Sequence, residues 1–348
     1  MNASFQRLMA DATRLTRAGD LQAATAAIQA ALGRSTSAPP VDDTGVIDVV
    51  AREIGTEPEA PPRRQPPHTG QFVSGSHADA NGSRDYKLYV PPGFAGQALP
   101  LVVMLHGCTQ DPDDFAAGTG MNEAALERGF FVLYPAQAQH VNASRCWNWF
   151  KHNHQRRGRG EPALLAGMTR EVMKRQPIDP DRVYVAGLSA GGAMAAILGD
   201  AYPDLFAAVG VHSGLPSGSA SDVGSAFAAM KSGAAAGGST GRTPPTIVFH
   251  GDQDTTVHPV NGEQVIAASA AGATPEFVRA RSGNGRAYTR GIYRDAGGRV
   301  VAEHWLVHGA GHAWSGGSAR GSYTDAKGPD ASEEMLRFFF AHSLHSER

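Results

Sequence analysis

The stretch VAGLSAGGAM, residues 185–194, decides how the fold of this chain is interpreted. An apolar run typical of a buried strand ends here, a serine stands between glycines, and an Ala-rich segment follows. A strand, a tight turn and a helix in succession can hold a serine on a sharp bend with its hydroxyl exposed. Gly187, Ser189 and Gly191 satisfy the pattern G-x-S-x-G. We therefore predict that Ser189 is a nucleophile, with an ordinary Gly-rich turn as the alternative.

The segments on both sides of this turn alternate between strand-like and helix-like composition. Such alternation predicts an α/β fold with a mostly parallel sheet and helices on both of its faces. The last two strands flank the sequence DAGGR and are expected to form a hairpin. The expected strands are 86–91, 99–107, 129–135, 181–187, 206–214, 245–251, 276–281, 287–294 and 299–307, and the expected helices are 113–128, 161–176, 190–201, 259–272 and 332–342.

Apolar residues also recur at helical spacing near the N-terminus, on both sides of a break at RAGD. This pattern predicts a small helical hairpin over residues 1–34, a Pro-rich linker over 35–69 and the α/β domain over 70–348. Two roles are open for the hairpin: a packing appendage, or an element that docks to a protein partner or a polymer granule.

The composition argues against several classes of protein. The net charge of −2 gives no basic field for nucleic acid. The basic segment 151–160 is expected to be a solvated loop, with contact to an acidic substrate as the alternative. No run approaches the ~20 apolar residues of a membrane helix, so no membrane span is expected. Charges interrupt the first residues, so we read no secretory signal and expect a cytoplasmic location, or secretion if Met1 is a recloned start.

A nucleophilic serine needs a base, and the base needs a carboxylate that orients it. The segment FHGDQDTTVHP ends a predicted strand and offers Asp252 and Asp254, of which Asp254 is favoured because it lies deeper in the loop. The late segment VHGAGHAWSGG offers His308, which still reads as strand, and His312, which follows two glycines and can project from a loop. The sequence therefore predicts the set Ser189, Asp254 and His312.

An early strand ends in HGCTQ, and its loop can supply backbone N–H groups to a developing oxyanion. We assign this role to the amides of Cys108 and of Ala190, the residue after the nucleophile; a structural turn is the alternative. Three histidines spaced by four residues invite a metal site, but the spacing needs a helix, no HExxH is present, and the segment reads as strand and loop. We expect neither a metal nor a cofactor.

The segments LHGCTQDPDDFAAGTGMN, CWNWF, RGEP, GLSAGGAM, HGDQDTTVHPVNG and GHAWSGG together resemble the polyhydroxybutyrate depolymerase family of esterases, which is close to the feruloyl and acetylxylan esterases. The resemblance covers about 80–345. It implies an α/β-hydrolase fold and ester hydrolysis without a cofactor, with the catalytic triad on Ser189, Asp254 and His312.

The resemblance also implies that Cys108 and Cys146 lie close together, either bridged or as two reduced, buried cysteines. Trp147, Trp149 and Trp314 would then offer flat apolar walls for the substrate, although a tryptophan is more often part of a core. The Gly/Ser/Ala-rich segment 216–245 reads as a lid beside the site or as a floppy insertion.

The residues predict a serine esterase, and the resemblance implies that it hydrolyses short-chain polyhydroxyalkanoate (3-hydroxybutyrate) polyester or its oligomers. Feruloyl or acetyl esters of carbohydrates are the alternative substrates. A hypothesis from another class is a non-catalytic binding protein that acts through the hairpin of residues 1–34. Secreted depolymerases of the family that this chain resembles have a secretory signal and usually a separate polymer-binding domain. We read neither in this sequence, so crystalline polymer is the less expected substrate.

Overall fold

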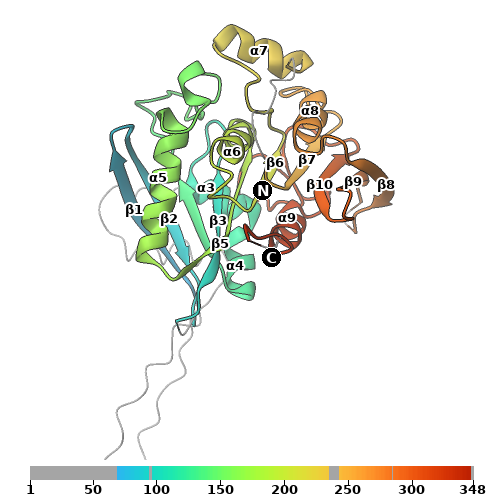
Figure 1. Ribbon diagram of the computed structural model, residues 1–348. Coiled ribbons are helices and arrows are strands. Elements are labelled where there is room, and N and C mark those ends of the chain that lie inside the picture. Colours follow the sequence, from blue (N-terminus) through green and yellow to red (C-terminus); the bar gives the residue numbers. More distant parts are fainter. Residues whose placement is uncertain (1–68, 94–95, 235–242, 284, 346–348) are drawn as a thin grey trace, which may run out of the picture. The chain divides into compact units, whose positions relative to one another are not determined.

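The computed structural model describes residues 69–93, 96–234, 243–283 and 285–345. The predicted hairpin over 1–34 and nearly all of the predicted linker lie outside the described residues. The rest of the chain forms an α/β fold around one large sheet, as the alternation of strand-like and helix-like segments predicted (Figure 1).

Ten strands form this sheet, in the order β1-β2-β4-β3-β5-β6-β7-β10-β9-β8. The six central strands, from β4 to β10, run parallel to one another, and antiparallel strands extend the sheet at both edges. Figure 1 shows β1 at one side of the molecule and β8 at the other. The strands are β1 Gln71–Asp79, β2 Gly82–Val90, β3 Leu99–Leu105, β4 Phe131–Pro135, β5 Ile178–Leu188, β6 Ala208–His212, β7 Thr246–Gly251, β8 Thr274–Arg281, β9 Ala287–Arg294 and β10 Val300–Val307, with a separate pair β11 Trp314–Ser315 and β12 Thr324–Asp325.

Helices cover both faces of the sheet, and strand β3 shows why two hydrophobic cores result. Leu101, Val103 and Leu105 of β3 belong to one core, whereas the alternate residues Val102 and Met104 belong to the other. The first core also contains residues of α5, α6, α7 and α8, and the second contains residues of α3, α4 and α9. The helices are α3 Pro112–Thr119, α4 Met121–Arg128, α5 Gly160–Arg175, α6 Ala190–Ala201, α7 Val223–Ser232, α8 Val260–Ser269 and α9 Ala331–Phe340, with a 3₁₀ turn η1 at His152–His154.

Two differences from the expected elements have clear local causes. The single helix expected over 113–128 is two helices, because Gly120 adopts a left-handed conformation (φ 65°) that ends α3 and begins α4. Strand β1 was not predicted, because its sequence QFVSGSHAD is polar and mostly exposed and carries little hydrophobic alternation. It is held instead by backbone pairing with β2 along its whole length.

The parallel strands bring four loops to the same edge of the sheet. Strands β3, β5, β7 and β10 end at Leu105, Leu188, Gly251 and Val307, and the segments that follow them contain all of the predicted catalytic and oxyanion residues. In open α/β sheets, sites form at the carboxyl ends of the strands. The fold therefore gathers the predicted residues at one rim, although they are far apart in the sequence.

Candidate active site

Ser189 occupies the turn between β5 and α6, in a backbone conformation that few residues adopt. Its φ of 58° and ψ of −119° lie outside the regions favoured by non-glycine residues, and such strain concentrates at functional sites. The amide of Ser189 donates to the carbonyl of His212 at 2.9 Å, and its own carbonyl accepts from Ala193 at 2.9 Å. The side chain forms no capping hydrogen bond to the helix. Backbone bonds thus hold the bend and leave the hydroxyl for another role.

The glycines around Ser189 are required because backbone atoms approach them too closely for any side chain. A Cβ on Gly191 would lie 2.0 Å from the Leu105 carbonyl oxygen, and one on Gly187 would lie 2.4 Å from the carbonyl carbon of Gly191. A Cβ on Gly107, in the loop after β3, would lie 3.6 Å from the Ser189 Cβ. The G-x-S-x-G pattern therefore reflects close packing of the turn against β3, and it places the predicted oxyanion loop beside the serine.

The predicted base and its orienting carboxylate are hydrogen-bonded to each other. His312 Nδ1 lies 2.7 Å from Asp254 Oδ2. The Asp254 carboxylate is buried, and its other oxygen accepts from the amides of Thr256 and Val257 at 2.9 and 2.8 Å. Burial alone would raise the pKa of Asp254, but hydrogen bonds from His250, His312 and the Val257 amide hold that pKa well below its usual range. Asp254 is therefore ionised, as a group that orients a histidine must be.

The rejected candidates also form a pair, and its geometry explains the difference. His308 Nδ1 lies 2.9 Å from Asp252 Oδ2, so each aspartate has its own histidine. The other ring nitrogen of His308 is 2.9 Å from the Thr289 hydroxyl on β9, which ties this pair to the strand next to β10. The side chains of Asp252 and His308 are each 29% exposed, whereas the Asp254 carboxylate is fully buried.

The nucleophile and the base–carboxylate pair come from separate loops of the same rim. Within the described residues, the hydrogen bonds of His312 reach Asp254 and not Ser189. A serine–histidine bond in a free enzyme is often long and shortens only when substrate is bound. The structure therefore shows the predicted base joined to its carboxylate, and the predicted nucleophile on a separate turn of the same sheet edge.

The predicted oxyanion loop is fixed by side chains and by a disulfide. Gln110 accepts from the Gly107 amide at 2.9 Å and donates to Asp114 at 2.8 Å, which ties the loop to α3. Cys108 is joined to Cys146 by a disulfide bond. The amides of Cys108 and Ala190 donate to no backbone or side-chain acceptor among the described residues. An oxyanion requires backbone N–H groups that are not already paired, so both amides are available for the predicted role.

Comparison with known proteins places this geometry in a family. Residues 84–282 match the family model described as Esterase PHB depolymerase. The chain belongs to this family. It is 34% identical over 241 residues to the poly(3-hydroxyalkanoate) depolymerase C of Paucimonas lemoignei, a match that covers 64% of this chain and 57% of that protein. It is 34% identical over 249 residues to the poly(3-hydroxybutyrate) depolymerase of Ralstonia pickettii, covering 65% and 50% of the two chains.

Other relatives of this PHB depolymerase family member act on different esters. The feruloyl esterase B of Thermothelomyces thermophilus is 31% identical over 198 residues, covering 51% of this chain and 67% of that one. The solved acetyl xylan esterase of Aspergillus awamori has the same fold, with a TM-score of 0.62 and 20% identity, and the match covers 77% of this chain and 99% of that one. The chain spans only about half the length of the two bacterial depolymerases.

The expectation that tryptophans form substrate walls is wrong for this structure. Trp147, Trp149 and Trp314 are 0%, 4% and 1% exposed, so none presents a face to a ligand. The indole N–H of Trp147 donates to the His106 carbonyl at 3.1 Å, and that of Trp314 donates to Ser332 at 3.1 Å. These side chains are core elements, because a large aromatic ring gains most by complete burial with its N–H satisfied. Through its bond to His106, Trp147 supports the loop that follows β3.

Buried histidines also support the site and are kept uncharged. Burial is the main cause that lowers the pKa of His106 to about 4, and the pKa of His212 lies well below its usual value for the same reason. His106 Nε2 accepts from the Gln137 amide, and His212 Nε2 accepts from the Ser315 amide. Neutral imidazoles here add no positive charge beside His312. Among the described residues, no group of three or more His, Cys, Asp or Glu side chains is arranged to hold a metal.

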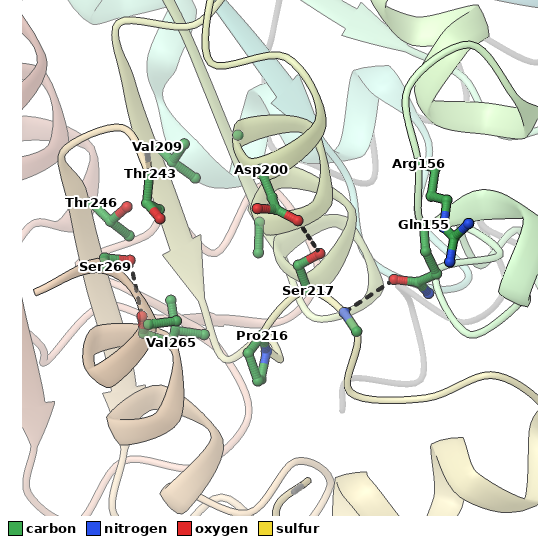
Figure 2. Close-up of a pocket in the computed structure, with 14 residues that line it drawn as sticks. Gln155, Arg156, Asp200, Val209, Pro216, Ser217, Thr243, Thr246, Val265 and Ser269 are labelled. Carbon is green, nitrogen blue, oxygen red and sulfur yellow. Dashed lines mark hydrogen bonds between the residues drawn. The ribbon is translucent and has the colours of Figure 1, made fainter. Parts of the chain in front are cut away.

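A cavity of about 270 Å³ lies away from these residues, between α6 and α8. It is lined by the C-terminal half of α6, including Asp200, and by the segment 216–218, and none of Ser189, Asp254 and His312 contributes to its wall (Figure 2). Figure 2 shows the Ser217 hydroxyl donating to Asp200, at 3.1 Å, across one side of this cavity. The sheet edge that contains Ser189, Asp254 and His312 is therefore separate from this cavity.

The described part of the segment predicted to be a lid or an insertion is tied to its neighbours. Asp222 caps the start of α7, and the Met230 carbonyl at its other end accepts from the His258 amide at 2.7 Å. Asn261 of α8 donates to the Ala229 carbonyl at 2.9 Å.

No helix in the part of the chain that the structure describes is long and apolar enough to cross a membrane.

Sequence reasoning missed three supporting features. It did not identify Gln110, whose side chain anchors the predicted oxyanion loop, or His250, which lies beside Asp254. It also missed Tyr323, whose hydroxyl lies 3.1 Å from the Thr109 hydroxyl of that loop. Gln110 and His250 stand within quoted motifs, so their positions next to assigned residues were a usable signal. Nothing in the local sequence around Tyr323 connects it with Thr109.

Proposed function

We propose that this protein is a serine esterase in which Ser189, His312 and Asp254 form the catalytic triad. The observation that carries the proposal is the partly buried Asp254–His312 hydrogen bond of 2.7 Å, at the same carboxyl-terminal edge of the sheet as the strained turn of Ser189. Membership of an esterase family and the names of its relatives support the same reaction.

The reaction follows from these positions. Ser189 Oγ attacks the ester carbonyl carbon while His312 Nε2 takes the hydroxyl proton. The amides of Cys108 and Ala190 donate to the oxyanion, and Asp254 stabilises the charged imidazole. The bond to the leaving alcohol breaks, and His312 gives its proton to the alcohol oxygen. A water then attacks the acyl-enzyme in the same way, which releases the acid and restores Ser189.

The triad is tested by two kinds of substitution, measured on a p-nitrophenyl butyrate substrate. Ser189→Ala is expected to lower kcat by on the order of 10⁵–10⁶. Asp254→Asn is expected to lower kcat by about 10⁴, because it favours the wrong histidine tautomer. The matched control Asp252→Asn changes an aspartate two residues away that binds His308, and it should lower kcat less than about tenfold. Near-parental turnover by the Ser189 variant would end the proposal.

We further propose that the substrate is a short-chain polyhydroxyalkanoate polyester or its oligomers, built from 3-hydroxybutyrate. Two relatives at 34% identity carry depolymerase names. The second candidate is a feruloyl or acetyl ester of a carbohydrate, which is favoured by the relatives named feruloyl esterase B and acetylxylan esterase A. Turnover of 3-hydroxybutyrate oligomers and of methyl ferulate by the same preparation distinguishes the two, since each candidate predicts a clear preference.

A non-catalytic role is the alternative of another class. In that case the hydrolase residues would be idle, and a fluorophosphonate probe would leave Ser189 unlabelled. We expect one adduct per chain on Ser189, and we expect Ser189→Ala to abolish it. An unlabelled parent protein would favour a binding function instead.

A further inference from the structure

A second imidazole lies against Asp254, on the side that His312 does not occupy. His250 is a fully buried residue of β7, four positions before Asp254. Its Nε2 lies 2.8 Å from the Val257 carbonyl oxygen and 3.4 Å from Asp254 Oδ2. A carbonyl oxygen can only accept, so Nε2 of His250 carries a proton. His250 therefore donates to the Val257 carbonyl, and the same N–H group lies within ion-pair distance of the Asp254 carboxylate.

Asp254, Val257 and His250 are linked to one another by a ring of contacts. The Val257 amide donates to Asp254 Oδ1, while the Val257 carbonyl accepts from His250. His312 and His250 approach the same oxygen, Oδ2, at 2.7 and 3.4 Å. The neighbouring Asp252 accepts from His308 and from the Gly309 amide, and no second imidazole from the described part of the chain contacts it. Of the two aspartate–histidine pairs, only the buried one is held in this way.

We propose that His250 is a positioning residue of the active site, which holds the Asp254 carboxylate in the orientation that His312 needs. The inference rests on the proposed function, because it assigns a role within the proposed triad. His250 touches neither the ester nor Ser189. It acts by limiting rotation of the carboxylate. It also interacts with the negative charge of the carboxylate, which would otherwise interact with His312 alone.

The other ring nitrogen of His250 lies in an apolar, buried environment beside a second histidine. His250 Nδ1 is buried without a partner, and so is Nε2 of His304 on β10. Both nitrogens face Gly262 of α8, where an added Cβ would lie 3.0 and 3.2 Å from them. Burial lowers the pKa of His304 to about 4, and the nearby His212 is also uncharged. Nδ1 of His250 has no hydrogen-bond partner among the described residues, so His250 approaches the Asp254 carboxylate through Nε2 alone.

The test compares two substitutions that differ in one N–H group. His250→Leu removes the donor, and we expect kcat to fall about 10- to 100-fold with KM changed less than about twofold, the loss typical of a hydrogen bond to a charged group. The carboxylate then interacts more strongly with His312, so the acid limb of kcat/KM moves to higher pH. His250→Gln keeps an amide N–H near the position of Nε2, and it should recover most of kcat and the parental acid limb.

The matched control is His304→Leu, which removes a neighbouring buried imidazole that does not contact Asp254. We expect it to lower stability while kcat and the acid limb stay parental. If the Leu variant of His250 does not fold, His250→Asn serves in its place, because its amide lies near Nδ1 and not Nε2; it should show the loss expected of Leu.

Two results would overturn the inference. One is parental kcat and an unmoved acid limb in His250→Leu or His250→Asn. The other is an equal loss of kcat in His304→Leu, which would mean that core packing alone is responsible. Either result leaves the proposed function intact as long as Ser189→Ala is inactive, whereas an active Ser189→Ala would remove both.

Discussion

The disulfide between Cys108 and Cys146 offers a prediction that separates stability from catalysis. It joins two segments of the chain that hydrogen bonds also join. The two cysteines are separated by 38 residues. Closing a loop of this length lowers the entropy of the unfolded chain, which corresponds to about 4 kcal/mol of stability at 25 °C. For a domain of this size, a loss of about 4 kcal/mol lowers Tm by about 8–16 °C.

Catalysis should be affected much less than stability. The Thr109 amide donates to the Ser144 carbonyl at 2.7 Å, and the Trp147 indole donates to the His106 carbonyl at 3.1 Å. These bonds join the same two segments without the disulfide, and Gln110 holds the loop from the other side. The amide of Cys108 therefore keeps its place when the sulfur atoms are separated. We expect kcat to fall less than about tenfold, a small change for a loop that contains an oxyanion donor.

The assay uses the double variant Cys108→Ser/Cys146→Ser, which leaves no free thiol, together with the reduced parent as a second route to the same state. Unfolding is followed by heat and by urea, and kcat is measured below the transition of both proteins. A double variant that unfolds within about 2 °C of the parent would refute the loop-entropy argument. A variant with parental Tm and a kcat lowered 100-fold would show that the bond holds the oxyanion loop and contributes little through the unfolded chain.

The remaining predictions concern buried charge. The buried guanidinium of Arg84 lies 3.0 Å from the Glu161 carboxylate. Glu161→Gln leaves that guanidinium without an anion and should lower the free energy of unfolding by about 3–5 kcal/mol. The control Glu333→Gln removes a half-exposed partner of Arg128, and it should lower the free energy of unfolding in urea by less than about 1 kcal/mol. His304 has a folded pKa of about 4 against about 6.5 in the unfolded chain, so between these values the unfolded state binds more protons, and stability falls as the pH drops. Between pH 7.5 and pH 5 this histidine accounts for a loss of roughly 2 kcal/mol, which His304→Gln should remove; an identical pH dependence in that variant would contradict the assignment.

Much of the fold could be predicted because the buried parallel strands are short apolar runs, and the helices between them have helical spacing. The elements that were missed lack those signals. Strand β1 is polar and edge-placed, and its pairing with β2 comes from the backbone. Gly120 divides one predicted helix into two through a left-handed conformation, which a periodicity of apolar residues does not reveal.

The site was predictable where chemistry restricts the residue type and was not where packing decides. Ser189 is flanked by glycines because the Leu105 carbonyl leaves no room for a side chain, so the sequence pattern records a steric fact. The tryptophans carry no such mark, since an indole serves a core and a substrate wall equally well. Only burial separates the two, and burial depends on the whole fold.

The register of two strands explains why the choice between aspartates and between histidines comes out as it does. Strands β7 and β10 are parallel neighbours, and their last paired residues are Gly251 and Val307. The next residues, Asp252 and His308, therefore continue the register and meet directly, and the Asp252 amide still donates to the Val307 carbonyl at 3.1 Å. This first pair closes the end of the sheet. Asp254 and His312 lie beyond the last paired residues, so their hydrogen bond does not depend on the register of the two strands.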